Sequence, residues 1–207
     1  NVVGVITAPD KPQGRGQKLE GSPVKQAAER LGLHILQPTN LKNPEFQQEL
    51  RDLKADLQIV VAFRMLPESV WNMPPLGTFN LHASLLPNYR GAAPINWAII
   101  NGEKETGVTT FRLQHAIDTG DILLQEHIGI SPDMTAGELH DTMMEVGAQT
   151  LVKTLVGLIA GTIQSKPQEE TLASLHAPKI FTKDCQIDWQ QPVTQIHNLI
   201  RGLAPFP

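Results

Sequence analysis

The chain has 207 residues, of which 41% are hydrophobic and 18% charged, a composition typical of a soluble globular protein with a substantial core. Its formal net charge of −4 excludes a surface that is basic throughout, so contact with a nucleic acid would need a local basic patch. The single cysteine, Cys185, excludes an internal disulfide framework and a cysteine-rich zinc site. No apolar run approaches the roughly 20 residues that span a bilayer, and no signal peptide is recognisable. We therefore expect a cytoplasmic protein of one or two domains.

The first third of the chain alternates between β-branched runs and segments with helical spacing. This βαβαβ order is typical of a parallel sheet in an α/β fold. Helix starts are marked by Ser22 before Pro23 and by Asn43 before Pro44. The predicted strands are 2–8, 33–38 and 56–63, and the predicted helices are 22–32 and 43–53.

The rest of the chain up to residue 161 continues with clear elements. The residues from Asp118 to Gly120 are typical of a turn between two predicted strands. Thr135 and Glu138 have the spacing of a capping box at the start of a long helix. The predicted helices are 68–71 and 94–101, the predicted strands are 78–84, 106–114 and 121–130, and the apolar stripe of the long helix is Leu139, Met143, Val146, Leu151, Leu155 and Leu158.

Polar side chains lie at the carboxyl end of the predicted strand 78–84, where open α/β sheets bind their ligands. Side chains two residues apart on a strand point to the same side, so Asn80 and His82 should project together. An amide that donates a hydrogen bond, beside an imidazole that donates or carries charge, can bind one developing negative oxygen. Asp118, on the loop after a neighbouring strand, would favour the charged form of the imidazole and fix its tautomer.

Taken alone, these residues also fit ordinary structural roles. A histidine and an aspartate far apart in sequence are more often structural than catalytic, and Asn80 would more often be a turn residue. Ser84 lacks the G-x-S-x-G elbow of a hydrolase nucleophile. His115, His127 and His140 lack metal-ligand spacing, so no metal site is expected.

Three stretches carry a more specific signal: FNLHASLLPNYRGAAPINWAI at 79–99, ETGVT at 105–109 and DTGDIL at 118–123. Together they closely resemble the catalytic core of the folate-dependent formyltransferases, and the resemblance covers nearly the whole chain. It implies a Rossmann-like α/β domain, with a mostly parallel sheet, that binds 10-formyltetrahydrofolate and transfers its formyl group to an amine. It also implies that Asn80, His82 and Asp118 are the catalytic residues, with the first two stabilising the oxyanion formed when the amine attacks the formyl carbon.

The same resemblance implies a site for the folate co-substrate. The run VVAFRMLP, residues 60–67, lies where the family builds its pteridine pocket, and the SLLP turn lies beside the catalytic residues. An ordinary strand end and helix cap would look similar at 60–67. The expected folate-binding residues are Phe63, Arg64, Met65, Leu66, Ser84, Leu85, Leu86 and Pro87.

The loop at 8–25 bears on the choice of acceptor. It resembles the insertion of those family members that formylate the α-amine of initiator methionyl-tRNA. Lys11, Arg15 and Lys18 concentrate positive charge in an acidic chain, and the loop glycines allow close approach to phosphates. A solvated, glycine-rich connector is the alternative interpretation. Sugar formyltransferases share a similar C-terminal tail, so this loop is the better discriminator.

The resemblance also predicts how the chain is organised. The first strand of the family and its glycine turn belong before Asn1, and a C-terminal β-barrel belongs after the tail, so we expect a fragment of a longer, monomeric protein. The predicted catalytic domain is 1–176, and 177–207 is the predicted linker. Three functions stay open: a formyltransferase acting on methionyl-tRNA or on a sugar amine or other small amine, a 10-formyltetrahydrofolate hydrolase, and a non-catalytic RNA- or folate-binding module.

Overall fold

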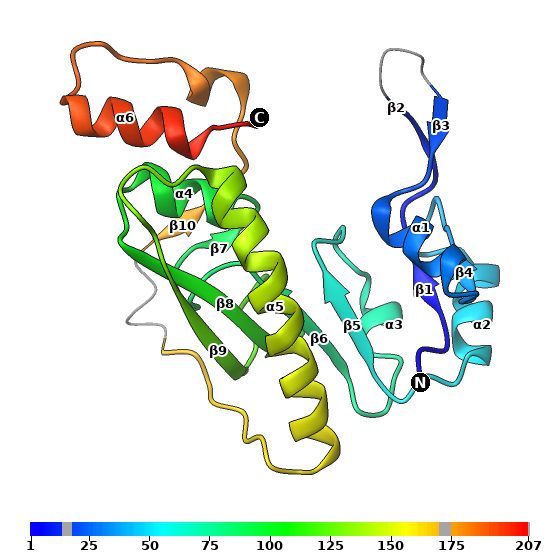
Figure 1. Cartoon of the computed structure of the whole chain (residues 1–207). Coiled ribbons are helices and arrows are strands. Elements are labelled where there is room, and N and C mark those ends of the chain that lie inside the picture. The colour runs from blue at the N-terminus through cyan, green and yellow to red at the C-terminus, as the bar shows by residue number, and fades with distance from the viewer. Residues whose placement is uncertain (14–17, 170–174, 207) are drawn as a thin grey trace. The chain divides into compact units, whose positions relative to one another are not determined.

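The structure is a computed structural model that describes residues 1–13, 18–169 and 175–206, with helices and strands alternating as in an α/β fold (Figure 1). The chain divides by its internal contacts into two units, which are described separately. No helix in the described ranges has the length and hydropathy needed to cross a membrane. The first unit is Asn1–Gln58 with Arg64–Thr78, and the second is Ile59–Phe63 with Phe79–Pro207.

The helices of the first unit begin at the two predicted caps. The hydroxyl of Ser22 accepts a hydrogen bond from the Lys25 amide at 3.2 Å, and the Asn43 side chain accepts from the Glu45 amide at 2.7 Å. These contacts satisfy amides that a helix start leaves without partners, and both caps are therefore confirmed.

The first unit contains two short strands that pair in parallel, β1 (Val5–Ile6) and β4 (Ile35–Leu36). Its helices are α1 (Pro23–Arg30), α2 (Pro44–Asp52) and α3 (Glu68–Trp71).

A β-hairpin lies between β1 and α1, where the sequence predicts only a loop. Its strands β2 (Lys11–Gln13) and β3 (Lys18–Glu20) are antiparallel. At its start, Asp10 accepts hydrogen bonds from Lys25 at 2.6 Å and from Gln37 at 2.8 Å. The bond from Lys25 lowers the pKa of the Asp10 carboxyl. The hairpin is thus attached to α1 through an ionised carboxylate.

The sheet that carries the candidate site lies in the second unit, apart from Gln58 and Thr78, which belong to the first. Its four strands lie in the order β5-β6-β8-β9. Strand β8 is antiparallel to both neighbours, whereas β7 and β10 form a separate parallel pair. The strands are β5 (Gln58–Val61), β6 (Thr78–His82), β7 (Arg90–Gly91), β8 (Glu105–Arg112), β9 (Ile122–Gly129) and β10 (His176–Ala177).

Helix α5 (Ala136–Ile159) packs on β8 and β9 (Figure 1). The predicted capping box is confirmed: Thr135 accepts from the Glu138 amide at 3.3 Å, and Glu138 accepts from the Thr135 amide at 2.8 Å. Leu139 and Met143 of the predicted apolar stripe are buried. The first half of the helix therefore follows the expected pattern.

In the second half of α5, glycines and threonines are buried instead of the predicted leucines. Leu151, Leu155 and Leu158 are only half-buried, whereas the buried positions are Gly147, Thr150, Thr154 and Gly157. The reason is close approach, because a Cβ on Gly147 would lie 2.9 Å from a methyl carbon of Leu81 in β6. The side chains of Thr154 and Thr110 also share a buried hydrogen bond of 2.8 Å.

This packing assigns the two faces of β6. Leu81 faces α5, and side chains alternate along a strand, so Asn80 and His82 lie on the face away from the helix. That opposite face is where the candidate site is built.

The C-terminal segment forms a helix that the sequence did not predict. Helix α6 (Val193–Gly202) packs on α4 (Pro94–Ile100), and a 3-10 helix covers Thr182–Cys185. In α6, Arg201 is buried and donates to the carbonyl of Met134 at 3.0 Å. The segment predicted as a linker therefore contains ordered structure within the second unit, and the boundary at residue 177 stays a prediction.

Two strand glycines provide a test of this packing. A Cβ on Gly107 of β8 would lie 2.2 Å from the Glu126 carbonyl oxygen, whereas one on Gly129 of β9 would meet nothing within 4 Å. We expect Gly107→Ala to lower the free energy of unfolding by about 1–3 kcal/mol, because the backbone must move to relieve the overlap. The control Gly129→Ala should stay within about 0.5 kcal/mol. Urea denaturation measures both, and equal stabilities would contradict the close β8–β9 approach.

Candidate functional site

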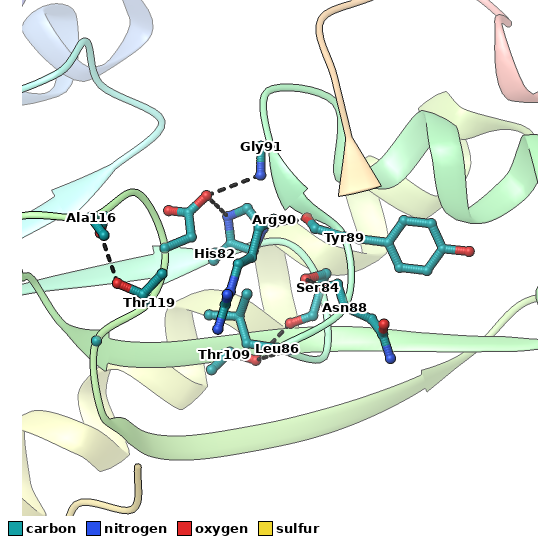
Figure 2. A network of polar contacts seen from close by, with 12 residues as sticks. His82, Ser84, Leu86, Asn88, Tyr89, Arg90, Gly91, Thr109, Ala116 and Thr119 are labelled. Atoms are coloured by element: carbon teal, nitrogen blue, oxygen red, sulfur yellow. Dashed lines mark hydrogen bonds and ion pairs between the residues drawn. The ribbon is translucent and has the colours of Figure 1, made fainter. Parts of the chain in front are cut away.

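His82 ends β6 with its ring held in one orientation. The residue is 7% exposed, and Nε2 lies 2.8 Å from the backbone carbonyl oxygen of Tyr89 (Figure 2). A carbonyl oxygen only accepts hydrogen bonds, so Nε2 carries the proton and donates. In the neutral ring, Nδ1 then has a free lone pair and can accept a proton.

Asp118 lies next to that nitrogen, as the sequence predicts. It is on the loop between β8 and β9, in the left-handed backbone region with φ of 54°. Its Oδ2 accepts a hydrogen bond from the Gly91 amide at 3.0 Å and lies 3.8 Å from His82 Nδ1 (Figure 2). The longer distance exceeds that of a hydrogen bond. It is short enough for the carboxylate to stabilise a charged imidazolium.

Asn80 contributes an unpartnered polar atom to the same face of β6. Its Oδ1 is shielded from solvent and has no hydrogen-bond partner among the described residues. Such an atom costs about 1–3 kcal/mol when it stays unsatisfied. A bound molecule that donates a hydrogen bond here would remove this cost. The orphaned oxygen therefore fits a site that is completed by its substrate.

Tyr89 holds the carbonyl that orients His82. Its backbone has φ of 60°, and its amide donates to the Leu175 carbonyl at 2.7 Å. Its phenol donates to the Glu103 carboxylate at 2.6 Å. Burial raises the pKa of the Tyr89 phenol, and the bond to Glu103 raises it further, so the phenol keeps its proton. The sequence offers no signal for this role, because Tyr89 contacts His82 through its backbone.

The SLLP turn, residues 84–87, is held by hydrogen bonds to β8. Ser84 is fully buried and its hydroxyl donates to the Asn88 carbonyl at 2.7 Å. Thr109 donates to the Ser84 carbonyl at 2.6 Å and accepts from the Leu86 amide at 3.2 Å (Figure 2). Leu86 is buried as well. The side chains of Ser84 and Leu86 thus support the turn itself.

The other two residues of the turn are more accessible. Leu85 and Pro87 are half-buried. A Cβ on Gly107 would lie 2.6 Å from a Leu85 methyl carbon, so Leu85 packs against β8 where that strand has no side chain. Gln125 of β9 donates to the Leu86 carbonyl at 3.0 Å and to the Thr109 hydroxyl at 2.9 Å, so it supports the turn together with Thr109. Folate contact by these four residues stays a prediction.

The predicted pteridine-pocket residues fall in both units. Phe63 is half-buried in the second unit. In the first unit, the Arg64 guanidinium donates to the carbonyls of Pro38 and Thr39, and Met65 is 74% exposed. Leu66, also in the first unit, is half-buried. Their contribution to one pocket stays a prediction.

The predicted tRNA-binding residues lie on or between the hairpin strands. Lys11 is exposed in β2, and Lys18 begins β3. Arg15 lies outside the described residues. Within 1–13, 18–169 and 175–206, no group of three His, Cys, Asp or Glu residues could hold a metal ion.

Two family models match the chain. The model described as formyl transferase matches residues 1–155, which include β1 to α5 up to Leu155 and therefore the whole candidate site. The model described as formyl transferase, C-terminal domain, matches residues 179–207.

Similar proteins agree with this assignment. The whole chain is 59% identical to a protein of Parabacteroides distasonis and 58% identical to one of Bacteroides fragilis, each named methionyl-tRNA formyltransferase. The chain spans 65% of the length of both. An N-formyltransferase structure from Helicobacter canadensis, with folinic acid and dTDP-3-aminofucose, matches with a TM-score of 0.71 at 23% identity, over 93% of this chain and 66% of that one. This last likeness concerns the fold, and it supports the predicted Rossmann-like α/β class.

The tautomer of His82 can be measured directly. We expect nitrogen NMR at a pH where the ring is neutral to find the proton on Nε2, because Nε2 donates to the Tyr89 carbonyl. His127 serves as an exposed comparison, since its Nδ1 lies 3.1 Å from Glu105. A proton on His82 Nδ1 would contradict the orientation described above.

Proposed function

The chain belongs to the formyl transferase family, and from this premise we propose that it is the catalytic part of a methionyl-tRNA formyltransferase. The reaction would move the formyl group of 10-formyltetrahydrofolate to the α-amine of initiator methionyl-tRNA. The observation that carries the proposal is the identity of 58–59% over the whole chain to proteins with that name. The site geometry supports it, because the buried His82 lies 3.8 Å from the Asp118 carboxylate and the same strand carries the unpartnered amide oxygen of Asn80.

The attacking group is an amine, which must be neutral to act as a nucleophile. Free α-amino groups titrate near pH ~7.7, so a large fraction is already neutral at physiological pH. The amine nitrogen attacks the formyl carbon, a new N–C bond forms, and the bond from that carbon to the folate nitrogen breaks. The protein must stabilise the negative oxygen that develops and move one proton between the two nitrogens.

His82 is the proposed proton carrier. Its Nε2 is occupied by the Tyr89 carbonyl, so Nδ1 is the nitrogen that can take the proton from the attacking amine. Once protonated, Nδ1 becomes a charged donor that can stabilise the oxyanion and then release the proton to the departing folate nitrogen. The Asp118 carboxylate, 3.8 Å away, stabilises the charged ring during this interval.

Asn80 is proposed to use both ends of its amide. The shielded Oδ1 would accept an N–H of the acceptor amine and so direct its lone pair toward the formyl carbon. The amide nitrogen would donate to the developing oxyanion. This dual use adds to the sequence-based interpretation, in which Asn80 acts only as a donor.

The folate co-substrate supplies the activated formyl group, and the accessible part of the SLLP turn is the proposed contact. Leu85 and Pro87 offer apolar surface beside His82, while Phe63, Arg64, Met65 and Leu66 stay proposed pteridine contacts. Donation from folate needs no metal in this proposal. The proposed protein is a cytoplasmic monomer that binds tRNA through the region of the β2–β3 hairpin.

The proposal is tested by product analysis on the complete protein with 10-formyltetrahydrofolate and methionyl-tRNA. Mass spectrometry should find formylmethionine on the tRNA. Free formate alone would assign a hydrolase, and formylation of an amino sugar alone would assign the sugar acceptor. Binding of either substrate without any product would leave a non-catalytic module.

Removal of either oxyanion ligand should slow formyl transfer strongly. We expect His82→Ala and Asn80→Ala each to reduce the rate by at least about 10²-fold, because each removes a group that acts on the developing oxyanion. The double variant should fall by less than the product of the two, since both groups act on one centre. His127→Ala, on the exposed part of β9, is the control and should keep full activity. Near-normal turnover of the single variants would refute the site.

We expect the basic residues of the hairpin segment to bind the phosphates of the acceptor tRNA. We expect neutralisation of Lys11, Arg15 and Lys18 to weaken tRNA binding and to flatten its salt dependence, by about one unit of slope for each phosphate that is no longer bound. Arg15→Ala should act most strongly, because a guanidinium can bind a phosphate or a guanine edge with two hydrogen bonds. Lys42→Ala, an exposed lysine of the same unit, is the control. If formylation were unchanged across the salt series, the proposed tRNA contact would be refuted, and the segment would be a solvated connector.

A further inference from the structure

Gln168 lies in the irregular segment after α5 and connects two parts of the site. The residue is 9% exposed. The side-chain oxygen accepts from Arg90 Nε at 3.1 Å and from Arg90 Nη2 at 2.6 Å. The side-chain nitrogen donates to the backbone carbonyls of Asp118 and Gly120, each at 2.8 Å. Both lone pairs and both N–H groups of this amide are therefore used.

The two carbonyls belong to the turn that presents the Asp118 carboxylate. Asp118 has a left-handed backbone, and Gly120 lies so close to Arg112 that a Cβ would overlap the Arg112 carbonyl oxygen. The backbone carbonyl oxygens of such a turn need hydrogen-bond donors from elsewhere in the chain, because a buried carbonyl without a donor destabilises the fold. Gln168 supplies that support from a position 50 residues further along the chain.

The segment that carries Gln168 is itself anchored. Lys166 exchanges two backbone hydrogen bonds of 2.8 Å with Ile122 at the start of β9. On the other side, Arg90 lies in β7 next to Gly91, whose amide binds the Asp118 carboxylate. The amide of Gln168 thus joins the Asp118 turn to β7, the strand that contributes the other contact of that carboxylate.

We propose that Gln168 is a positioning residue for formyl transfer: it sets the location of Asp118 relative to His82 by bridging Arg90 and the 118–120 turn. It does not touch the reacting atoms. The inference rests on the proposed function, because it assumes that the Asp118–His82 pair takes part in the transfer. It adds a residue that acts through the Asp118 carboxylate.

The test is a double-mutant cycle in the complete protein, measured as kcat and KM for formylation of methionyl-tRNA. Gln168→Met keeps the length of the side chain and removes all four hydrogen bonds. We expect kcat to fall about 10- to 100-fold, as for a small misplacement of a reacting group, with KM values within about twofold. Combined with Asp118→Asn, the Met substitution should slow the reaction little further, because it acts through that carboxylate.

Two more variants separate the contacts. Gln168→Glu keeps an acceptor for Arg90 but places a carboxylate oxygen against the two turn carbonyls, so it should be as slow as Gln168→Met. Gln168→Asn retains an amide yet is one methylene too short to span the gap, and it gives the same test if the Met variant unfolds in a thermal melt. Gln191→Met removes an exposed amide bonded to Asp188 and should leave the rate unchanged.

The outcomes distinguish this inference from the function on which it rests. A wild-type protein that forms no formylmethionyl-tRNA would refute the proposed function and, with it, this role. An active wild-type protein with folded Gln168 variants of normal rate would refute the positioning role alone. Rate decreases that multiply with those of Asp118→Asn would also refute it, because Gln168 would then act independently of the carboxylate.

Discussion

The hydrogen bond of 2.8 Å from His82 Nε2 to the Tyr89 carbonyl is the constraint on which the site depends. It decides which ring nitrogen carries the proton, and it turns Nδ1 toward Asp118. Without it the ring could rotate or change tautomer, and the carboxylate would face a different atom. The carbonyl is in turn fixed by the buried Tyr89 phenol bonded to Glu103, so a core tyrosine determines the chemistry of a histidine seven residues earlier.

The two faces of β6 have different surroundings: one packs against α5, and the other carries the candidate site. On one face, Leu81 meets Gly147 of α5, and the absence of a side chain at that glycine lets the helix approach closely. On the other face, His82 contacts the Tyr89 carbonyl and lies 3.8 Å from Asp118, and Asn80 points to the same side. Because both faces derive from the alternation of one strand, a slip of one residue would bury the candidate site residues, Asn80 and His82, under α5. The helix packing therefore fixes which residues reach the site.

Local features can be predicted from the sequence, whereas distant contacts can be predicted only where strand topology or family resemblance indicates them. Ser22, Asn43 and Thr135 cap their helices as predicted, because a cap depends on neighbours within a few residues. The pairing of Asp118 with His82 follows from strand topology and family resemblance. The four hydrogen bonds of Gln168 span 48 to 78 residues, and an isolated glutamine in an irregular segment gives no signal.

Other differences have local explanations. The hairpin around residues 11–20 escapes prediction because its short strands contain Pro12 and enclose glycines, a pattern typical of loops. Helix α6 falls in the predicted linker, although Ile196, Leu199 and Ile200 have helical spacing that indicates a helix.

The central claim is that His82 Nδ1 carries the transferred proton with help from Asp118. It is tested most directly by single-turnover formyl transfer as a function of pH, for the complete protein and for Asp118→Asn, whose amide oxygen can still accept from Gly91. The account predicts a slower reaction with an altered pH dependence, and an unchanged rate and pH profile would contradict it.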